Sequence, residues 1–240
     1  MSRELPDPAS VRTLLLDAGG VLVRPSFARV ALALRDRGID VSAEALAAAE
    51  ARAKKQLDLP PSPGLERDEQ RGWHYFNLVL ARAGIARSVA TDGALAELKA
   101  WHDVHNAWED VPDGVREALD RLRASGRTLV VVSNANGTVV TLFRRLGLLD
   151  RFAAVLDSAV EGVEKPDPRL FRMALERVCA DPATTLHVGD MYQVDVVGAR
   201  AAGLRVVLVD SDGLYPDADC PRVPSLLALA EHLCPAGGGR

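Results

Sequence analysis

Cysteine is scarce in this 240-residue chain, where Cys179, Cys220 and Cys234 are scattered and form no Cys-x-x-Cys pair. An odd, scattered set argues against a disulfide framework or a zinc site and favours a reducing compartment. The N-terminal residues contain no hydrophobic signal core, and no apolar run approaches the roughly 20 residues of a membrane span. We therefore expect a soluble, cytoplasmic protein without a membrane partner.

Basic stripes are lacking as well, and the formal net charge of −4 at pH 7 is mild. This balance gives no reason to expect a nucleic-acid partner. The chain also contains no Gly-x-Ser-x-Gly elbow, phosphate-binding P-loop or Gly-x-Gly-x-x-Gly fingerprint. Serine hydrolase, P-loop nucleotidase and dehydrogenase functions are therefore not supported. The sequence leaves the oligomeric state open between a monomer and a homodimer.

The apolar content of 48% is enough for a substantial core. The chain divides into two parts that differ in composition and in their pattern of apolar residues. The segment 25–110 is alanine-rich and shows no convincing strand. Its apolar spacing, prolines and glycines predict helices over 26–37, 42–57, 66–83 and 92–108. We therefore expect an all-helical domain there, inserted into a second domain made of residues 1–24 and 111–240.

In the second domain, short apolar runs alternate with helical patterns. The predicted strands cover 12–17, 128–133, 153–157, 185–189 and 205–210. The predicted helices cover 112–125, 136–146, 168–178, 192–202 and about 225–233. Repeated strand–helix units with right-handed crossovers build a parallel sheet that has helices on both faces. The expected fold class is α/β, with a three-layer α/β/α Rossmann-like core.

Polar side chains that can carry chemistry stand at or near the ends of these predicted strands. Asp17 ends the first strand, and Ser133 and Asn134 end the second. Asp190 follows the fourth strand, and Lys165 opens a Lys-Pro-Asp-Pro loop that follows the third. A parallel sheet gathers its strand ends at one edge, where ligands bind. The sequence therefore predicts a site that combines two carboxylates, a hydroxyl and a cation.

In this order, the motifs resemble those of the haloacid dehalogenase superfamily of hydrolases, with a helical C1-type cap inserted after the first motif. The matching segments are 14–22, 130–134, 163–168 and 186–199, so the resemblance covers almost the whole chain. Residues Gly72–Phe76 and His187–Tyr192 resemble the subgroup named "haloacid dehalogenase-like hydrolase domain-containing". The resemblance implies the α/β core with a helical cap and an activity of hydrolysis, but it says little about the substrate.

The resemblance implies that Asp17 is the nucleophile, which attacks phosphorus to form an aspartyl-phosphate that water then hydrolyses. It also implies that Asp17, Asp190 and the backbone carbonyl of Gly19 hold Mg²⁺. Hard oxygen ligands of this kind suit magnesium, which bridges to phosphate. The implied substrate is a small phosphorylated molecule.

The same resemblance assigns the remaining polar residues to the phosphoryl group and to the support of the metal. Ser133, the backbone amide of Asn134 and Lys165 would bind the phosphoryl oxygens and oppose developing charge. Asp195, one turn into the helix after the fourth strand, would orient metal-bound waters or Lys165. Two further candidates on the substrate side are Arg24, at the hinge into the cap, and Trp73, within the cap.

One expected residue is missing, because Gly19 stands where phosphatases of the resembled superfamily usually carry an Asp. That Asp protonates the leaving alcohol and later activates water, and the loss of such a group typically costs ~10²–10⁴ in rate. Three outcomes follow: a phosphatase that is slow or limited to good leaving groups, chemistry that does not need the acid, or a binding protein on an enzyme fold.

Chemistry without the acid has two precedents within the resemblance. L-2-haloacid dehalogenases have Tyr at the position of Gly19 and lack a Gly-Asp pair, so Asp190 argues against dehalogenation. Phosphonoacetaldehyde hydrolases have a small residue there, retain magnesium and use a cap lysine, for which Lys54 and Lys55 are candidates. The leading hypothesis is a Mg²⁺-dependent phosphatase, and the alternatives are phosphonate C–P cleavage and a catalytically weak binding protein.

Overall fold

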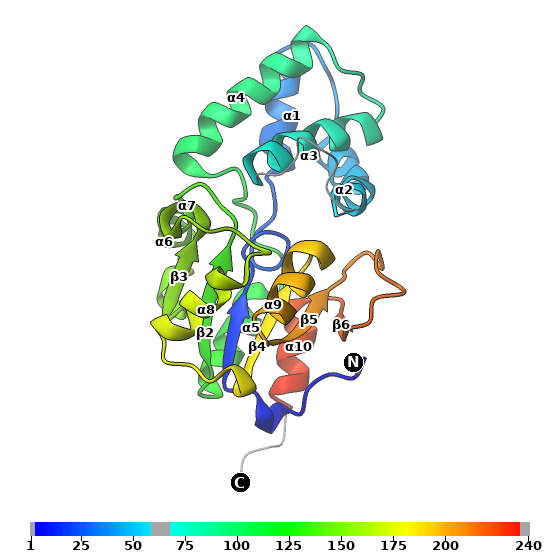
Figure 1. Ribbon diagram of the computed structural model, residues 1–240. Helices are drawn as coiled ribbons and strands as arrows, with labels where there is room; N and C mark the ends of the chain where they lie inside the picture. Colours follow the sequence, from blue (N-terminus) through cyan, green and yellow to red (C-terminus); the bar gives the residue numbers. More distant parts are fainter. Residues whose placement is uncertain (1–2, 59–67, 236–240) are drawn as a thin grey trace. The chain divides into compact units, whose positions relative to one another are not determined.

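The computed structural model describes residues 3–58 and 68–235 and divides into two compact units (Figure 1). The core unit comprises Met1–Arg24 and Val111–Arg240, and the helical unit comprises Pro25–Asp110. The predicted start of the third helix at Glu66 lies outside the described residues. Within the described part of the chain, no helix combines the length and the apolar character that crossing a membrane requires.

The core unit is built on a six-stranded sheet in the order β3-β2-β1-β4-β5-β6, in which every neighbouring pair is parallel. The strands are β1 (Thr13–Leu16), β2 (Thr128–Ser133), β3 (Ala154–Asp157), β4 (Thr185–Gly189), β5 (Arg205–Val209) and β6 (Arg222–Val223). All four residues of β1 and all five of β4 are buried. Burial on both faces explains why these strands read as continuous rather than alternating apolar runs.

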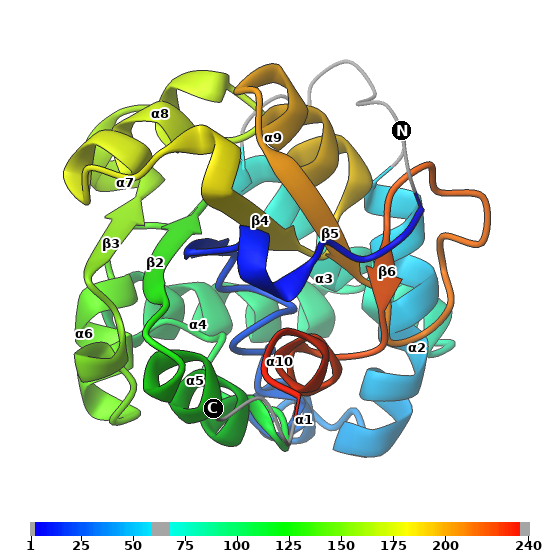
Figure 2. The ribbon, with the colours of Figure 1, turned by 90° about the horizontal axis from the view of Figure 1, so that it is seen from below.

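Helices cover both faces of this sheet. They are α5 (Val115–Ala124), α6 (Val139–Arg145), α7 (Ser158–Glu161), α8 (Pro168–Arg177), α9 (Val197–Ala201) and α10 (Leu226–Leu233). Figure 2 shows α8 and α9 on one side of the sheet, and α5, α6 and α10 on the other. The predicted three-layer α/β/α Rossmann-like fold is therefore confirmed. The sequence did not predict β6 and α7, which are too short to show a period.

Apolar spacing explains why these helices lie where they do. In α5 the buried residues are Val115, Ala118, Leu119 and Leu122, which fall on one helical face at spacings of three and four. Asp167 accepts a hydrogen bond from the backbone N–H of Arg169 and so caps the start of α8, as a turn residue between two prolines. The core between sheet and helices includes Leu15, Val130 and Phe171.

The helix predicted over 192–202 is present, but its first part is not α-helical. A π-helical turn, Tyr192–Val196, comes first, and α9 begins only at Val197. The wider turn accommodates Asp195, whose carboxylate accepts hydrogen bonds from the backbone N–H groups of Asp190 and Met191. Insertions of this kind are frequent at functional sites.

The helical unit consists of α1 (Phe27–Arg35), α2 (Ala43–Leu57), α3 (Asp68–Arg82) and α4 (Val89–His105) in its described residues. It has its own core, which includes Leu34, Phe76 and Leu98. The start predicted for the last helix, at residue 92, is three residues late because Ser88 and Thr91 form a capping box. The helix also ends earlier than residue 108, because Asn106 adopts a positive φ of 65°.

The two ends of the helical unit are joined to each other. The backbone N–H of Ser26 donates to the carbonyl of Ala107 over 2.9 Å. Close by, the Arg29 Nε donates to Glu109 Oε1 over 2.7 Å. The point where the chain enters the unit is thereby tied to the point where it leaves.

Candidate active site

The end of β1 and the end of β4 lie side by side in the core unit. Leu16 of β1 pairs with Val188 of β4, and the N–H of Asp17 continues the ladder by donating to the Val188 carbonyl over 2.9 Å. Asp190 follows the same strand one residue beyond its end. The two carboxylates are buried, and they lie together because parallel strands end at the same edge.

Lys165 links the first of these carboxylates to a third. Its Nζ lies 2.8 Å from Asp17 Oδ1 and 2.8 Å from Asp195 Oδ1, and the residue is only 1% exposed. Burial alone would lower the pKa of Lys165, but the two carboxylates outweigh it and raise that pKa above its usual value. The ammonium group therefore stays charged.

The pKa values of the carboxyl groups of Asp17 and Asp195 are shifted in opposite directions. Burial raises the pKa of Asp17 to about 8, opposed by Lys165 and assisted by the negative charges of Asp195 and Asp190. Burial acts on Asp195 too, yet Lys165 and His187 together hold its pKa well below the usual range. Asp195 is therefore the carboxyl group of the cluster that stays ionised. The ionised form of Asp17 would be favoured by a further cation nearby.

The residues at this edge fit a hard divalent cation. Oxygen atoms of Asp17, Asp190 and Asp195 lie within 4.8 Å of one another. Asp195 is already engaged through both oxygens, since Oδ1 faces Lys165 and His187 while Oδ2 accepts from two backbone amides. An ion would therefore meet Asp17 and Asp190, an oxygen donor set of the kind that magnesium prefers.

A tight turn after Asp17 brings the backbone up to this carboxylate pair. The N–H groups of Leu22 and Val23 both donate to the carbonyl of Ala18, over 2.9 Å each. Gly20 has a φ of 76°, and a Cβ placed there would overlap the carboxylate of Asp190. Only glycine allows this close approach, which sets the backbone of Gly20 directly beside the carboxylate of Asp190.

Ser133 and Asn134 end β2, next to the Lys165 loop. Ser133 is buried, and among the described residues its hydroxyl makes one long contact of 3.4 Å, to the carbonyl of Asn134. The Asn134 side chain instead grips the backbone of Lys165: Nδ2 donates to the Lys165 carbonyl over 2.9 Å, and Oδ1 accepts from its N–H over 2.7 Å. The sequence suggested a role for the Asn134 backbone amide and did not predict this use of its side chain.

His187 is the residue of this site that sequence reasoning missed. It is completely buried in β4, with Nε2 3.0 Å from Asp195 Oδ1 and Nδ1 3.0 Å from the carbonyl oxygen of Leu15. Burial lowers its pKa, against the pull of Asp195. The signal available in the sequence was a titratable side chain within the otherwise uncharged strand Thr185–Gly189, where a polar ring needs a partner.

Other predicted residues are not part of this cluster. Arg24 is exposed at the end of the first segment of the core unit. Trp73 is half-buried in α3, stacked on Phe76 with 5.7 Å between ring centroids. Lys54 and Lys55 are half-buried in the last turn of α2. The stacking on Phe76 places Trp73 in the aromatic packing of the helical unit.

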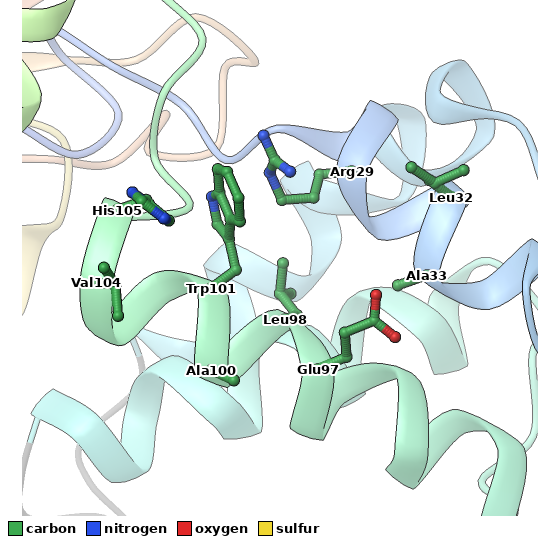
Figure 3. Close-up of a pocket in the computed structure, with 9 residues that line it drawn as sticks. All are labelled: Arg29, Leu32, Ala33, Glu97, Leu98, Ala100, Trp101, Val104 and His105. Atoms are coloured by element: carbon green, nitrogen blue, oxygen red, sulfur yellow. The ribbon is translucent and has the colours of Figure 1, made fainter.

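The helical unit also contains a pocket of about 300 Å³ between α1 and α4. Figure 3 shows the Trp101 ring standing between the side chains of Arg29 and His105. The Arg29 guanidinium lies 3.7 Å from the Trp101 ring centroid, in a cation–π contact. The lining combines this pair with apolar residues of both helices, and it includes none of the residues that the sequence assigned to catalysis.

Comparison with known proteins gives concordant matches. The family model described as haloacid dehalogenase-like hydrolase matches residues 11–203. Haloacid dehalogenase-like hydrolase domain-containing protein 3 of Bos taurus is 32% identical over 94% of this chain and 93% of its own. A phosphoserine phosphatase of Thermus thermophilus is 52% identical over 30% of this chain and 28% of its own.

Among solved structures, the HAD-hydrolase YfnB of Bacillus subtilis, solved bound to magnesium, superposes with a TM-score of 0.69. It is 25% identical in sequence, and the match covers 94% of this chain and 99% of that one. The likeness extends over both the sheet-containing and the helical segments, since so little of either chain is left out.

Proposed function

The chain belongs to the haloacid dehalogenase-like hydrolase family, and from this premise we propose that it is a Mg²⁺-dependent phosphatase of a small phosphorylated metabolite. The observation that carries the proposal is the buried chain of ion pairs from Asp17 through Lys165 to Asp195. It sets a nucleophilic carboxylate against a permanent cation. The phosphatase activity named for the Thermus relative supports the same class of reaction.

In the proposed reaction, a carboxylate oxygen of Asp17 attacks phosphorus, and the bond from phosphorus to the substrate oxygen breaks. The resulting aspartyl-phosphate is then attacked by water at phosphorus, which releases inorganic phosphate and restores the carboxylate. Both the N–H of Ala18 and the Nζ of Lys165 reach Oδ1 of Asp17, each over 2.8 Å. Two donors on one oxygen fix the rotation of the nucleophile.

The phosphoryl oxygens would be bound by Lys165, the Ser133 hydroxyl and the backbone amide of Asn134. Lys165 is buried, so its charge is screened less than that of a surface lysine and acts more strongly on developing negative charge. Ser133 supports this assignment because it is buried at a strand end and, within the part of the chain that the structure describes, its hydroxyl makes one long contact, at 3.4 Å. A phosphoryl oxygen would give its hydroxyl a closer partner.

Magnesium would be held by Asp17, Asp190 and the backbone carbonyl of Gly19. The support is the oxygen donor set, the close approach of the glycine turn to Asp190, and the raised pKa of Asp17. When bound, the ion supplies positive charge that lets an anionic nucleophile approach an anionic substrate. The magnesium reported for the Bacillus neighbour agrees with this assignment.

Gly19 sets the limit of the proposed activity. A glycine offers no side chain to protonate the leaving alcohol, so the leaving group must depart with little help. Substrates with good leaving groups, such as aryl and acyl phosphates, are therefore favoured over alkyl phosphates. This expectation concerns the rate and not the route through Asp17.

We further propose that the helical unit, residues 25–110, acts as a cap that selects the substrate. Interdomain movement is reported for the Bacillus neighbour, which matches this chain over both units. Our candidates for further contacts with the substrate are Arg24, exposed at the end of the first core segment, and Trp73 of α3. Closure of such a cap excludes water from the reacting centre.

We place this enzyme in the cytoplasm. Cys179, Cys220 and Cys234 are all free thiols, and Cys179 is exposed. An exposed free thiol suits a reducing compartment.

The test is the release of inorganic phosphate from p-nitrophenyl phosphate and acetyl phosphate, in Mg²⁺ or in EDTA. We expect turnover by the wild type that depends on Mg²⁺ and disappears in Asp17→Asn, because an amide cannot form the covalent intermediate. Asp167→Asn is the matched control, since Asp167 caps α8 and has no part in the site.

Full activity of Asp17→Asn would refute the aspartyl-phosphate route. Absence of turnover by the wild type on both substrates would move the assignment to the alternatives. Borohydride trapping of an aldehyde on Lys54 or Lys55 would then indicate phosphonate cleavage, and binding of Mg²⁺ and phosphate without turnover would indicate a binding protein.

A further inference from the structure

We propose that His187 is a positioning residue, which holds the carboxylate of Asp195 and through it both Lys165 and the turn that carries Asp190. The inference rests on the proposed function, because Lys165 and Asp190 are the groups assigned there to phosphate and to Mg²⁺. Nothing in the reaction itself uses His187, so its burial at the centre of the site needs a separate explanation.

The ring bridges the two strands that deliver the acids. His187 lies on β4, three residues before Asp190, and its Nδ1 is 3.0 Å from the carbonyl oxygen of Leu15, two residues before Asp17 on β1. On its other side, Nε2 is 3.0 Å from Asp195 Oδ1. Phe171 packs its ring against the imidazole at 84°, with 4.9 Å between centroids, and so fixes the imidazole plane.

Oxygen atoms face both ring nitrogens, so the ring is placed to donate. The stronger of the two bonds goes to the anionic carboxylate, and we therefore assign a proton to Nε2. His187 is 0% exposed, as is the side chain of Asp195. Water cannot reach such a site, so a bond lost between Nε2 and Oδ1 would not be replaced by one to solvent.

Asp195 connects His187 to the other residues of the site through its two carboxylate oxygens. Its Oδ1 is shared by His187 and Lys165, and its Oδ2 accepts from the N–H groups of Asp190 and Met191 over 3.1 and 3.0 Å. Loss of the imidazole donor would leave Oδ1 with the ammonium group alone. The carboxylate would then draw Lys165 away from Asp17, or rotate and release the amide that orients Asp190.

Replacing His187 by glutamine or by asparagine distinguishes a hydrogen-bonding role from a role in packing alone. The amide nitrogen of Gln can occupy the place of Nε2, whereas that of Asn reaches only the place of Nδ1. His187→Gln therefore retains the donor to Asp195, and His187→Asn retains only the contact with Leu15. His232→Asn is the control, because His232 lies in the core unit and its Nε2 contacts the backbone oxygen of Pro6.

The first measurement is the affinity for MgCl₂ alone, by calorimetry, together with kcat and KM for p-nitrophenyl phosphate. For His187→Asn we expect Mg²⁺ affinity and kcat to fall by about 10–100-fold, the range typical of residues that orient metal ligands. His187→Gln should recover most of both losses, and His232→Asn should match the wild type. Circular dichroism and melting curves establish that each variant is folded.

Equal losses in His187→Gln and His187→Asn would overturn the inference, because they would show that only packing matters. Unchanged Mg²⁺ affinity and kcat in a folded His187→Asn would overturn it as well.

A second measurement does not depend on the proposed function. In the metal-free protein labelled with ¹⁵N-histidine, we expect a His187 Nε2 proton that exchanges slowly and shifts in Asp195→Asn. A rapidly exchanging wild-type proton would overturn the inference even if Asp195→Asn fails to fold. If the wild type neither binds Mg²⁺ nor turns over substrate, the proposed function fails, and this spectrum alone decides whether His187 positions Asp195.

Discussion

Asn134 shows how, at the scale of a single residue, a short side chain can position a residue that is distant in sequence. Its amide bonds both the N–H and the carbonyl of Lys165, across 31 positions of chain. Lys165 lies in a loop and has no strand ladder to fix its backbone. The two bonds therefore determine where its long side chain begins, which a flexible lysine stem cannot do for itself.

Replacement of Asn134 by Ala removes both of these bonds, so we expect the Lys165 backbone to shift. Phosphatase activity should fall by about 10–100-fold, and the free energy of unfolding by about 1–3 kcal/mol. Steady-state kinetics and denaturant unfolding measure the two effects. Ser225→Ala is the control: it removes the cap of α10, which bonds the N–H of Ala228, and should lower stability without lowering activity. Equal kinetics for both variants would contradict the role of Asn134.

Replacement of Gly19 by Asp restores the acid that the sequence lacks. We expect turnover of alkyl phosphates to rise by up to ~10²–10⁴, and turnover of p-nitrophenyl phosphate to rise far less, because only the poor leaving group needs a proton. The ratio of the two kcat/KM values measures this effect independently of overall damage. Calorimetry with Mg²⁺ shows whether the new side chain disturbs the ion. A uniform change for both substrates would mean that the acid is not what limits the rate.

At the scale of elements, the turn after β4 is the feature that assembles the site. The π-helical turn Tyr192–Val196 folds Asp195 back over Gly189, whose missing side chain makes the room. A Cβ at Gly189 would overlap the carboxylate of Asp195. The end of β4, the π-helical turn and the start of α9 therefore act as one unit. Glycine is needed at position 189 because a side chain there would overlap Asp195, and not because its backbone adopts a positive φ.

Gly189→Ala should displace Asp195 and weaken both the ion pair with Lys165 and the bonds to the turn. We expect loss of most activity and about 1–3 kcal/mol of stability, the typical effect of overpacking a buried position. Gly93→Ala in α4 is the matched control, since the nearest atom to its new Cβ is the flexible end of Arg37 and alanine favours a helix. It should leave activity unchanged and stability equal or higher. Similar losses in both variants would contradict the contact argument.

Strands and their ends could be predicted from the sequence because a buried parallel strand has a plain signature. The runs ending at Asp17, Ser133 and Gly189 are short, apolar and bounded by turn residues, so β2 and β4 were predicted with the bounds that the structure shows. The π-helical turn could not be predicted, because its cause is a carboxylate accepting from backbone amides. Hydrogen bonds of that kind leave no period in the sequence.

The candidate site was predictable only as far as residue types point to chemistry. Asp17 and Asp190 are acidic residues directly after strands and Lys165 is a basic residue in a loop, and these features are visible in the sequence. The side-chain grip of Asn134 and the ring of His187 act on neighbours that only the folded sheet brings near. A buried polar residue requires a partner, but the sequence alone cannot say which partner it has.

At the scale of the whole molecule, the charge balance of the site links metal binding to stability. Oxygen atoms of Asp17, Asp190 and Asp195 lie within 4.8 Å of one another, whereas the ammonium group of Lys165 pairs only with Asp17 and Asp195 among the described residues. One ammonium group does not balance three ionised carboxylates, so a further cation would favour the charged form of Asp17. A cation that binds the folded chain and not the unfolded one stabilises it by mass action. The melting temperature of the core unit would therefore report on the binding of Mg²⁺.

Addition of Mg²⁺ at about 100 times its dissociation constant should stabilise the protein by ~2.7 kcal/mol. For a chain of this size that corresponds to a rise of about 5–10 °C in melting temperature, and EDTA should reverse it. Scanning calorimetry at constant ionic strength measures the shift. Asp190→Asn should lose it, whereas Asp181→Asn, which alters only the cap of a short helical turn, should keep it. A shift that persists in Asp190→Asn would place the ion elsewhere.

The joined ends of the helical unit have a consequence for the history of such proteins. Because Ser26 bonds Ala107 and Arg29 pairs with Glu109, the inserted segment starts and finishes at one point. The core unit therefore has to accommodate only two chain ends that lie close together, whatever the length of the insertion. A segment of this kind is modular, because one helical insert can be exchanged for another while the sheet and the ends of its strands are kept.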